Sequence, residues 1–413
     1  MEVRTINLKD WNKERLVRVL FYIGLAIAVL GSTTPWFFWP LGEKTVIISS
    51  ALLLASMGVA NTTLTGQEGQ KADGTSFYSR QNFIIPLTLY IVVIIYTNIV
   101  KGQNVNAYIV KFFSIIPFYA IFRVRLSEIS KFCDVMAKAL GGFLVLSMFT
   151  FFLYLIGFSL PSRNAELANL YSCTNYFFFL IDDRTLFFII PRFQSIFAEP
   201  GHLGTFAVML LFTQIGKWKR WYNISLLIAV LISFSLAAYG LLIPVIFLGL
   251  WIRRQQMVKN FLYTTAILSS LTIASFYYND GDNLLHDFIM VRLEIEDGEM
   301  AGDNRVTEDF KVEYENFINS QDILTGRDRD MSEFGNSGYR VFIYDYGLIG
   351  LFLLASFYLV VMYQPDRKRE FISVIIIATL NFIIRGNILQ LFIFVYLYQV
   401  AKNSLLWIPQ NAS

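Results

Sequence analysis

The chain is poor in charge and in the residues that build metal sites and disulfide frameworks. Only 16% of its 413 residues are charged, whereas soluble domains carry about 25%. It has two cysteines and two histidines, with no Cys-x-x-Cys pair, which argues against a structural zinc site. Cys133 and Cys173 are predicted in loops on opposite faces, and two cysteines cannot form a disulfide framework. The scarcity of charge along the whole chain excludes an ordinary soluble domain.

Long apolar runs take up most of the sequence, which is 55% hydrophobic with a mean hydropathy of +0.51. A helix needs about 20 apolar residues to cross a hydrocarbon layer of ~30 Å. We therefore expect an all-α, polytopic integral membrane protein with about twelve transmembrane helices. The predicted spans are 16–31, 44–60, 83–100, 107–122, 135–158, 200–216, 223–238, 240–252, 260–277, 338–362, 371–384 and 388–402.

Three further stretches of the sequence carry structural predictions of their own. The apolar run 17–30 resembles a secretory signal, but no small-residue cleavage site follows it, so we expect a retained first span. Segment 159–199 holds two short apolar pieces separated by Asp182, Asp183 and Arg184, which predicts a re-entrant or interfacial segment. A very tight turn is predicted at 238–240.

One polar segment, 278–336, interrupts the apolar pattern. It holds 16 of the chain's 31 acidic residues and only 5 basic ones, so we expect one large extracytoplasmic loop between a bundle at 1–277 and the last spans at 337–413. Apolar residues recur at helical spacing over 306–318, which predicts an amphipathic helix capped by Asp303 or Asn304.

Basic residues predict the orientation of the spans. With twelve spans, the N-terminus, 123–131, 217–220, 253–259, 366–369 and Lys402 all fall on one side. The positive-inside rule makes that side cytoplasmic. Both termini are then cytoplasmic, and the acid-rich loop and segment 159–199 lie outside.

Three polar stretches could carry chemistry. In 191–210, Arg192 precedes Glu199 and Pro200; the plainest interpretation is that Arg192 reaches the membrane interface and Glu199 meets the first amides of a helix. In 233–245, small residues permit close helix approach or simply make a tight outer turn. The third stretch, 303–354, carries Arg305 and Arg340 and leads from the loop into a span.

In this order and spacing, the stretches resemble the bacterial O-antigen polymerase (Wzy) and O-antigen ligase superfamily of integral membrane glycosyltransferases. The matching elements are Arg192 with Glu199–Pro200, the small-residue hairpin SFSLAAYG, Arg305, the element LTGRD, and the run GNSGYRVFIYDYGLIGLF. The resemblance covers 185–355. Ligases of this superfamily carry a histidine near the end of the loop, where this chain has GNSG at 335–338.

The resemblance implies a polymerase of undecaprenyl-diphosphate-linked oligosaccharide repeats, of O-antigen or capsular type. It would act at the periplasmic face of a bacterial inner membrane and move the growing glycan to the non-reducing end of a new lipid-linked repeat. One alternative is an O-antigen ligase acting on lipid A core. Another is a flippase or secondary transporter, although transporters usually contain paired broken helices. The expected partners are the lipid-linked donor and acceptor, the bilayer and a chain-length regulator; neither nucleic acid nor a cofactor is expected.

The same resemblance suggests roles for individual residues. A departing lipid diphosphate needs fixed cations or a metal to stabilise its charge, and arginine grips phosphate with two parallel hydrogen bonds. A metal-independent site is favoured over ligation by 328–330 or 280–282. The predicted diphosphate ligands are Arg192 and Arg305, with Arg340 third. Arg385, at the outer end of the predicted span 371–384, is held in reserve. The candidate bases are Glu199, His286, Asp303 and Glu308.

Overall fold

The computed structural model describes residues 8–64, 77–78, 83–100, 102, 105–167, 171–183, 190–253, 257–281, 283, 286, 291, 295–296, 299–300, 307–328, 338–386 and 389–402. Arg305 and Asp303, two of the predicted site residues, lie outside the described residues.

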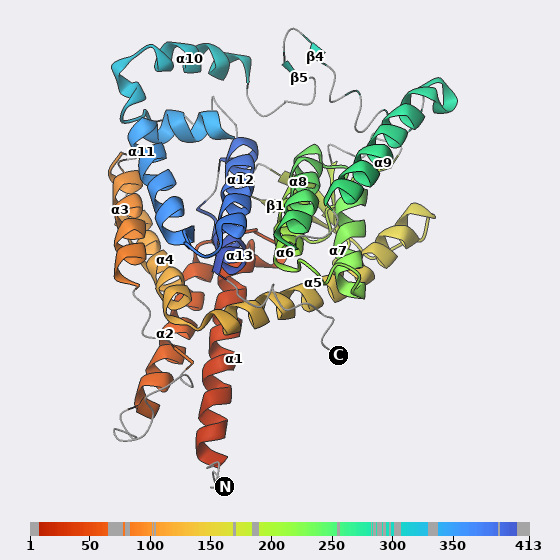
Figure 1. The fold of residues 1–413 in the computed structure, drawn as a ribbon. Helices are drawn as coiled ribbons and strands as arrows, with labels where there is room; N and C mark the ends of the chain where they lie inside the picture. Colours follow the sequence, from red (N-terminus) through yellow and green to blue (C-terminus); the bar gives the residue numbers. More distant parts are fainter. Residues whose placement is uncertain are drawn as a thin grey trace.

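Helices dominate the described chain (Figure 1). The α-helices are α1 (Leu8–Gly31), α2 (Lys44–Leu64), α3 (Ile84–Val100), α4 (Val105–Arg123), α5 (Leu126–Leu155), α6 (Pro200–Thr213), α7 (Trp221–Ile232), α8 (Leu236–Arg253), α9 (Met257–Tyr277), α10 (Glu308–Ile318), α11 (Tyr339–Met362), α12 (Lys368–Arg385) and α13 (Leu391–Lys402). Short 3-10 helices are η1 (Trp36–Phe38), η3 (Tyr278–Gly281) and η6 (Gln321–Ile323).

Every predicted span has a helix at its position. In the described chain, four helices contain a segment that is long and apolar enough to cross a membrane: α2, α5, α8 and α11. The protein is therefore mostly helical, with the apolar helices of a membrane-embedded chain. That all twelve of these helices cross the membrane stays a prediction.

Two small antiparallel sheets were not predicted. Segment 159–199 contains β1 (Arg163–Leu167), β2 (Tyr171–Asn175) and β3 (Leu180–Asp182) in that order across one sheet. The turn between β2 and β3 is closed by the Asn175 side chain, whose Oδ1 accepts a hydrogen bond from the Phe177 amide at 2.7 Å. A second hairpin pairs β4 (Ile295–Glu296) with β5 (Glu299–Met300).

The positions of the two cysteines and of one turn were predicted wrongly. Cys133 lies in α5 and Cys173 in β2, both buried and free, rather than in loops. The chain turns between α7 and α8 at 233–235, with Phe234 at a φ of 46°, rather than at 238–240. Residues 238–240 belong to α8 because Ser235 Oγ accepts from the Ala238 amide at 3.4 Å and so begins that helix earlier.

Helix α11, predicted as one continuous span, is broken at Gly347, which has a φ of 65° and a ψ of −174°. The first part lies beneath α10 and the second descends beside α3 (Figure 1). The turn after η6 fills the break: the Ile349 amide donates to Leu324 O at 3.0 Å, and the Arg327 amide donates to Tyr344 O at 2.7 Å. The later part of the acid-rich segment is thus fastened to the helix that follows it.

The amphipathic helix predicted over 306–318 is confirmed as α10. Its cap is Thr307, whose Oγ1 accepts from the Phe310 amide at 3.4 Å, and not Asp303 or Asn304. Phe310 and Phe317 are fully buried against Tyr344, with ring centroids 5.3 and 4.9 Å apart. The apolar surface beneath α10 is therefore the first part of α11.

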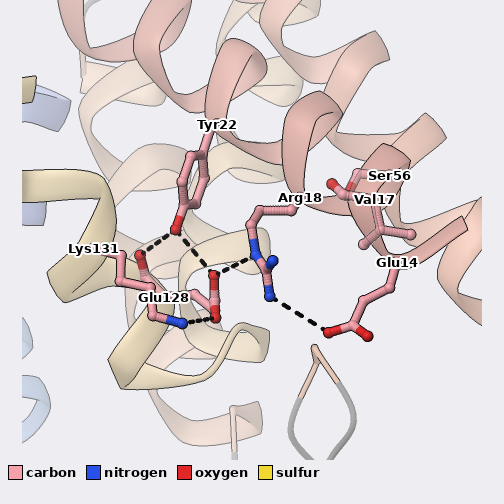
Figure 2. Close-up of polar contacts among 7 residues, drawn as sticks. All are labelled: Glu14, Val17, Arg18, Tyr22, Ser56, Glu128 and Lys131. Atoms are coloured by element: carbon pink, nitrogen blue, oxygen red, sulfur yellow. Dashed lines mark hydrogen bonds and ion pairs between the residues drawn. The ribbon is translucent and has the colours of Figure 1, made fainter. Parts of the chain in front are cut away.

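A buried carboxylate fastens α1 to α5 (Figure 2). The side chain of Glu128 is 0% exposed and accepts from Arg18 Nε at 3.1 Å, Lys131 Nζ at 2.8 Å and the Tyr22 hydroxyl at 2.9 Å. Arg18 also meets Glu14 on its own helix at 3.4 Å. A buried charge is tolerated when it is paired and hydrogen-bonded in this way.

Glu128→Ala is expected to destabilise the protein by about 1–3 kcal/mol, because Tyr22 loses a buried acceptor and the contact between α1 and α5 loses its anchor. Thermal unfolding of the purified protein in detergent would measure this as a clearly lower Tm. The matched control is Glu14→Ala, which removes the other partner of Arg18; that exposed pair is worth roughly 0.3–0.5 kcal/mol. Equal effects of the two substitutions would contradict the anchoring role of Glu128.

Candidate functional site

An ion pair joins the start of α6 to the end of α12. Arg385 Nη1 lies 3.4 Å from Glu199 Oε2, and the two side chains are only 14% and 30% exposed. Glu199 occupies the capping position before Pro200, with extended backbone, and Gly386 ends α12 in the left-handed conformation. Proline at the first helical position and glycine after the last one define these two helix ends, so both side chains are held by ordered backbone.

Glycines let the site close tightly. A Cβ atom on Gly201 would lie 2.0 Å from Arg385 Nη2, so the guanidinium rests directly on the first turn of α6. A Cβ atom on Gly204 would lie 2.3 Å from the Cβ of Ala238, so α6 and α8 are in close contact one turn further on. The prediction that small residues near 233–245 permit close helix approach is confirmed at Ala238.

Arg192 lies on the same end of α6. Its Nε donates to Ser233 O at 3.3 Å, in the turn between α7 and α8. Ser233 Oγ lies 3.6 Å from the Cβ position of Gly204. Gly204 and Gly201 are one helical turn apart on α6, so the turn that holds Arg192 lies beside α6 one turn beyond the point where the Arg385 guanidinium rests. The structure thus brings together residues that are far apart in sequence.

Arg340 lies in the first turn of α11, two residues after a backbone contact between α11 and the end of α12. A Cβ atom on Gly386 would lie 2.4 Å from Gly338 O, so the start of α11 touches the end of α12. Arg340 Nε donates to the Tyr339 hydroxyl at 3.4 Å.

Helix α10 reaches Arg340 from the acid-rich segment. Burial raises the pKa of Tyr314, and the nearby Tyr339 raises it further, whereas Arg340 lowers it. Helix α10 of the acid-rich segment therefore lies close to Arg340.

His202 belongs to this site, and the sequence prediction did not include it. It lies three residues after Glu199, and its amide donates to Glu199 O at 3.1 Å in the first turn of α6. Both Glu199 and Arg385 act on its imidazole electrostatically. Its Nδ1 is buried and has no hydrogen-bond partner in the part of the chain that the structure describes. The available signal was the place of His202 three residues after Glu199, at the start of the predicted span 200–216.

The remaining predicted bases have other surroundings. Glu308 is 84% exposed and forms an ion pair with Lys311 at 2.7 Å on α10. The His286 amide donates to Asn283 Oδ1 at 3.1 Å, and its ring packs edge-on to Phe276 of α9 at 5.1 Å. None of these contacts brings Glu308 or His286 to the pair of Arg385 and Glu199.

The LTGRD element, counted among the matching motifs, has a structural role. Arg327 forms ion pairs with Asp322 at 2.6 Å and with Glu313 at 2.8 Å. The hydrogen bond to Asp322 is the largest of several contributions to the raised pKa of Arg327. Gly326 has a φ of 87°, and a Cβ there would lie 2.5 Å from Asp345 O. The element therefore holds α10 and its turn against α11.

No group of three or more His, Cys, Asp or Glu side chains that could hold a metal ion occurs among the described residues. Of the two acidic strings considered for a metal, 328–330 and 280–282, each is described only in part.

Models of protein families, curated proteins and solved structures were all compared with the chain, and none matches it. The resemblance stated from the motifs therefore stays a prediction, and the geometry at the start of α6 carries the functional proposal.

Proposed function

We propose that the protein is a polymerase of undecaprenyl-diphosphate-linked oligosaccharide repeats that works without a metal. The observation that carries this proposal is the Arg385 guanidinium on the first turn of α6, paired with Glu199, with Arg192 bound to Ser233 O in the turn that lies beside the next turn of α6. The ordered motifs of the sequence supply the class of substrate.

The chemistry of the reaction fits a group of arginines. Transfer of the growing glycan breaks the bond between the anomeric carbon and a diphosphate oxygen, so negative charge develops on the leaving group. Guanidinium groups held in a partly buried site stabilise that charge more strongly than they would in water. Arg192, Arg385 and Arg340 would bind the diphosphate, with Arg305 as a further ligand from the acid-rich segment.

A transporter is the competing class, and one feature of α11 bears on it. Secondary transporters bind substrates at breaks in helices, and α11 is broken at Gly347. The backbone of Leu324 and Gly326 already occupies that break: a Cβ on Gly347 would lie 2.3 Å from Leu324 O. This favours a structural break over a substrate site.

The proposed setting is a bacterial inner membrane, crossed twelve times, with both termini cytoplasmic and the start of α6 facing the periplasm. Lipid-linked repeats then reach the arginines from the outer leaflet. A chain-length regulator is the expected protein partner.

The orientation is open to a labelling test. Both native cysteines are buried, so introduced ones will dominate the signal. Val312→Cys, on α10 at a position 62% exposed, is expected to react with a membrane-impermeant maleimide in intact spheroplasts. Lys219→Cys, exposed between α6 and α7, is expected to react only after the membrane is disrupted. The reverse pattern would contradict the proposed orientation.

The function is tested by supplying the purified protein, in lipid nanodiscs, with undecaprenyl-diphosphate-linked repeats and separating the products by length. We expect a ladder of longer lipid-linked glycans. Transfer only to added lipid A core would indicate a ligase. Movement of the lipid-linked repeat across the bilayer without elongation would indicate a transporter, and either result would overturn the proposal.

A further inference from the structure

We propose that His202 is the general base that takes the proton from the attacking hydroxyl of the acceptor glycan, an inference that rests on the proposed function. It names the residue that deprotonates the acceptor, for which the sequence offered only Glu199, His286, Asp303 and Glu308.

The position of His202 comes from the start of α6. Its amide bond to Glu199 O at 3.1 Å fixes it in the first helical turn, next to Gly201, on whose backbone the Arg385 guanidinium rests. The imidazole is therefore adjacent to a guanidinium that would hold the leaving diphosphate. A base must lie close to the reacting atoms, and the first turn of α6 carries His202 and is also where the Arg385 guanidinium of α12 rests.

The hydrogen bonding of His202 also calls for an explanation. Its Nδ1 is buried with no partner among the described residues, and leaving a buried polar atom unsatisfied costs about 1–3 kcal/mol. A catalytic role is one of the explanations for such an atom in a folded protein. The charged groups that act on the imidazole in the described chain are Arg385 from α12 and Glu199 from the segment before α6.

The other candidates are less suited to the role. Glu199 is paired with Arg385, and Glu308 is exposed and paired with Lys311. His286 is packed on Phe276 of α9. Within the described chain, His202 is the histidine next to the arginines.

The proposed step balances without a further reactant. The acceptor oxygen forms a bond to the anomeric carbon of the donor glycan, and its proton passes to the imidazole of His202. The bond from that carbon to the diphosphate oxygen breaks, and its electron pair leaves with the undecaprenyl diphosphate beside Arg385 and Arg192. Burial and Arg385 disfavour the imidazolium that results and the Glu199 carboxylate favours it, so the proton is passed on to solvent afterwards.

The test compares His202→Gln with wild type in nanodiscs supplied with the undecaprenyl-diphosphate-linked repeat. We expect kcat for elongation to fall about 100- to 10,000-fold, the usual contribution of a general base. The Kd of the lipid-linked repeat, measured by binding, is expected to stay within about twofold, because substrate and leaving group are held elsewhere. The acid side of the wild-type pH–rate profile is expected to disappear in this variant.

Two further variants keep the proposal falsifiable. The acid side of the profile is expected to survive in His286→Gln, which changes the competing histidine. If His202→Gln does not accumulate, His202→Ala is assayed with added imidazole, and recovery of elongation is expected. Full activity and an unchanged pH profile in His202→Gln, or no recovery with imidazole, would overturn the assignment. Failure of wild type to elongate would instead refute the proposed function.

Discussion

Arg385→Ala is expected to lower elongation of lipid-linked repeats about 100- to 1,000-fold. Removing one preorganised group that stabilises charge in the transition state typically costs that much. Arg385 lies on the backbone of Gly201 and pairs with Glu199, so its loss also leaves a partly buried carboxylate without its guanidinium. The measurement is the initial rate of product-ladder formation by purified protein in nanodiscs.

The matched control is Arg220→Ala. Arg220 is an exposed arginine just before α7, on the side predicted to be cytoplasmic, and its removal is expected to leave the rate within about twofold. Arg385→Lys is informative as well, because lysine keeps the charge but loses the planar fork; we expect a rate between those of wild type and Arg385→Ala. Equal rates for Arg385→Ala and Arg220→Ala would refute the role of Arg385.

Gly347→Ala is expected to produce the largest loss of stability. The backbone of Gly347 has φ 65° and ψ −174°, a region that side chains disfavour by about 1–3 kcal/mol. A Cβ would also lie 2.3 Å from Leu324 O and 2.7 Å from Gly326 N, so the turn after η6 must leave the break in α11. We expect a strongly lowered Tm, or little folded protein, in fluorescence-detected size-exclusion chromatography.

Gly58→Ala is the control for this experiment. Gly58 lies in α2, and a Cβ there meets nothing within 4 Å. Replacing a helical glycine by alanine at such a site is neutral or stabilises by roughly 0.5–1 kcal/mol. If Gly347→Ala were as stable as Gly58→Ala, the described fit of the turn into α11 would be wrong.

Hydropathy located the helices well, because apolar runs separated by polar connections need only local information. The amphipathic helix was predictable too, since Phe310 and Phe317 recur at helical spacing and proved to be buried. Its cap was misplaced because several residues before α10 have capping side chains, and the capping hydrogen bond in the described chain is made by Thr307.

Features that depend on tertiary contacts escaped prediction. The break at Gly347 exists because a distant turn packs into it, and a glycine within an apolar run gives no hint of that partner. From the sequence, Glu128 belonged to a basic connection at 123–131. In the structure it is buried and accepts hydrogen bonds from Arg18, Tyr22 and Lys131. The strands of 163–182 were hidden by a polar composition that also suits an irregular segment.

The candidate site was predictable in part. Motif order drew attention to Arg192, Glu199 and Arg340, and the predicted outer end of a span drew attention to Arg385. The structure brings Arg385 to Glu199 across 186 residues. The participation of His202 depends on which helix ends meet, and sequence spacing alone could not show that Arg385 lies over Gly201.

The most direct test of the account is a structure of the protein in nanodiscs with an undecaprenyl-diphosphate-linked repeat bound. The account predicts density for the diphosphate between the Arg192 and Arg385 guanidinium groups at the start of α6, with the first sugar close to His202. A diphosphate bound elsewhere, with these two arginines still packed on Ser233 and Glu199, would contradict it.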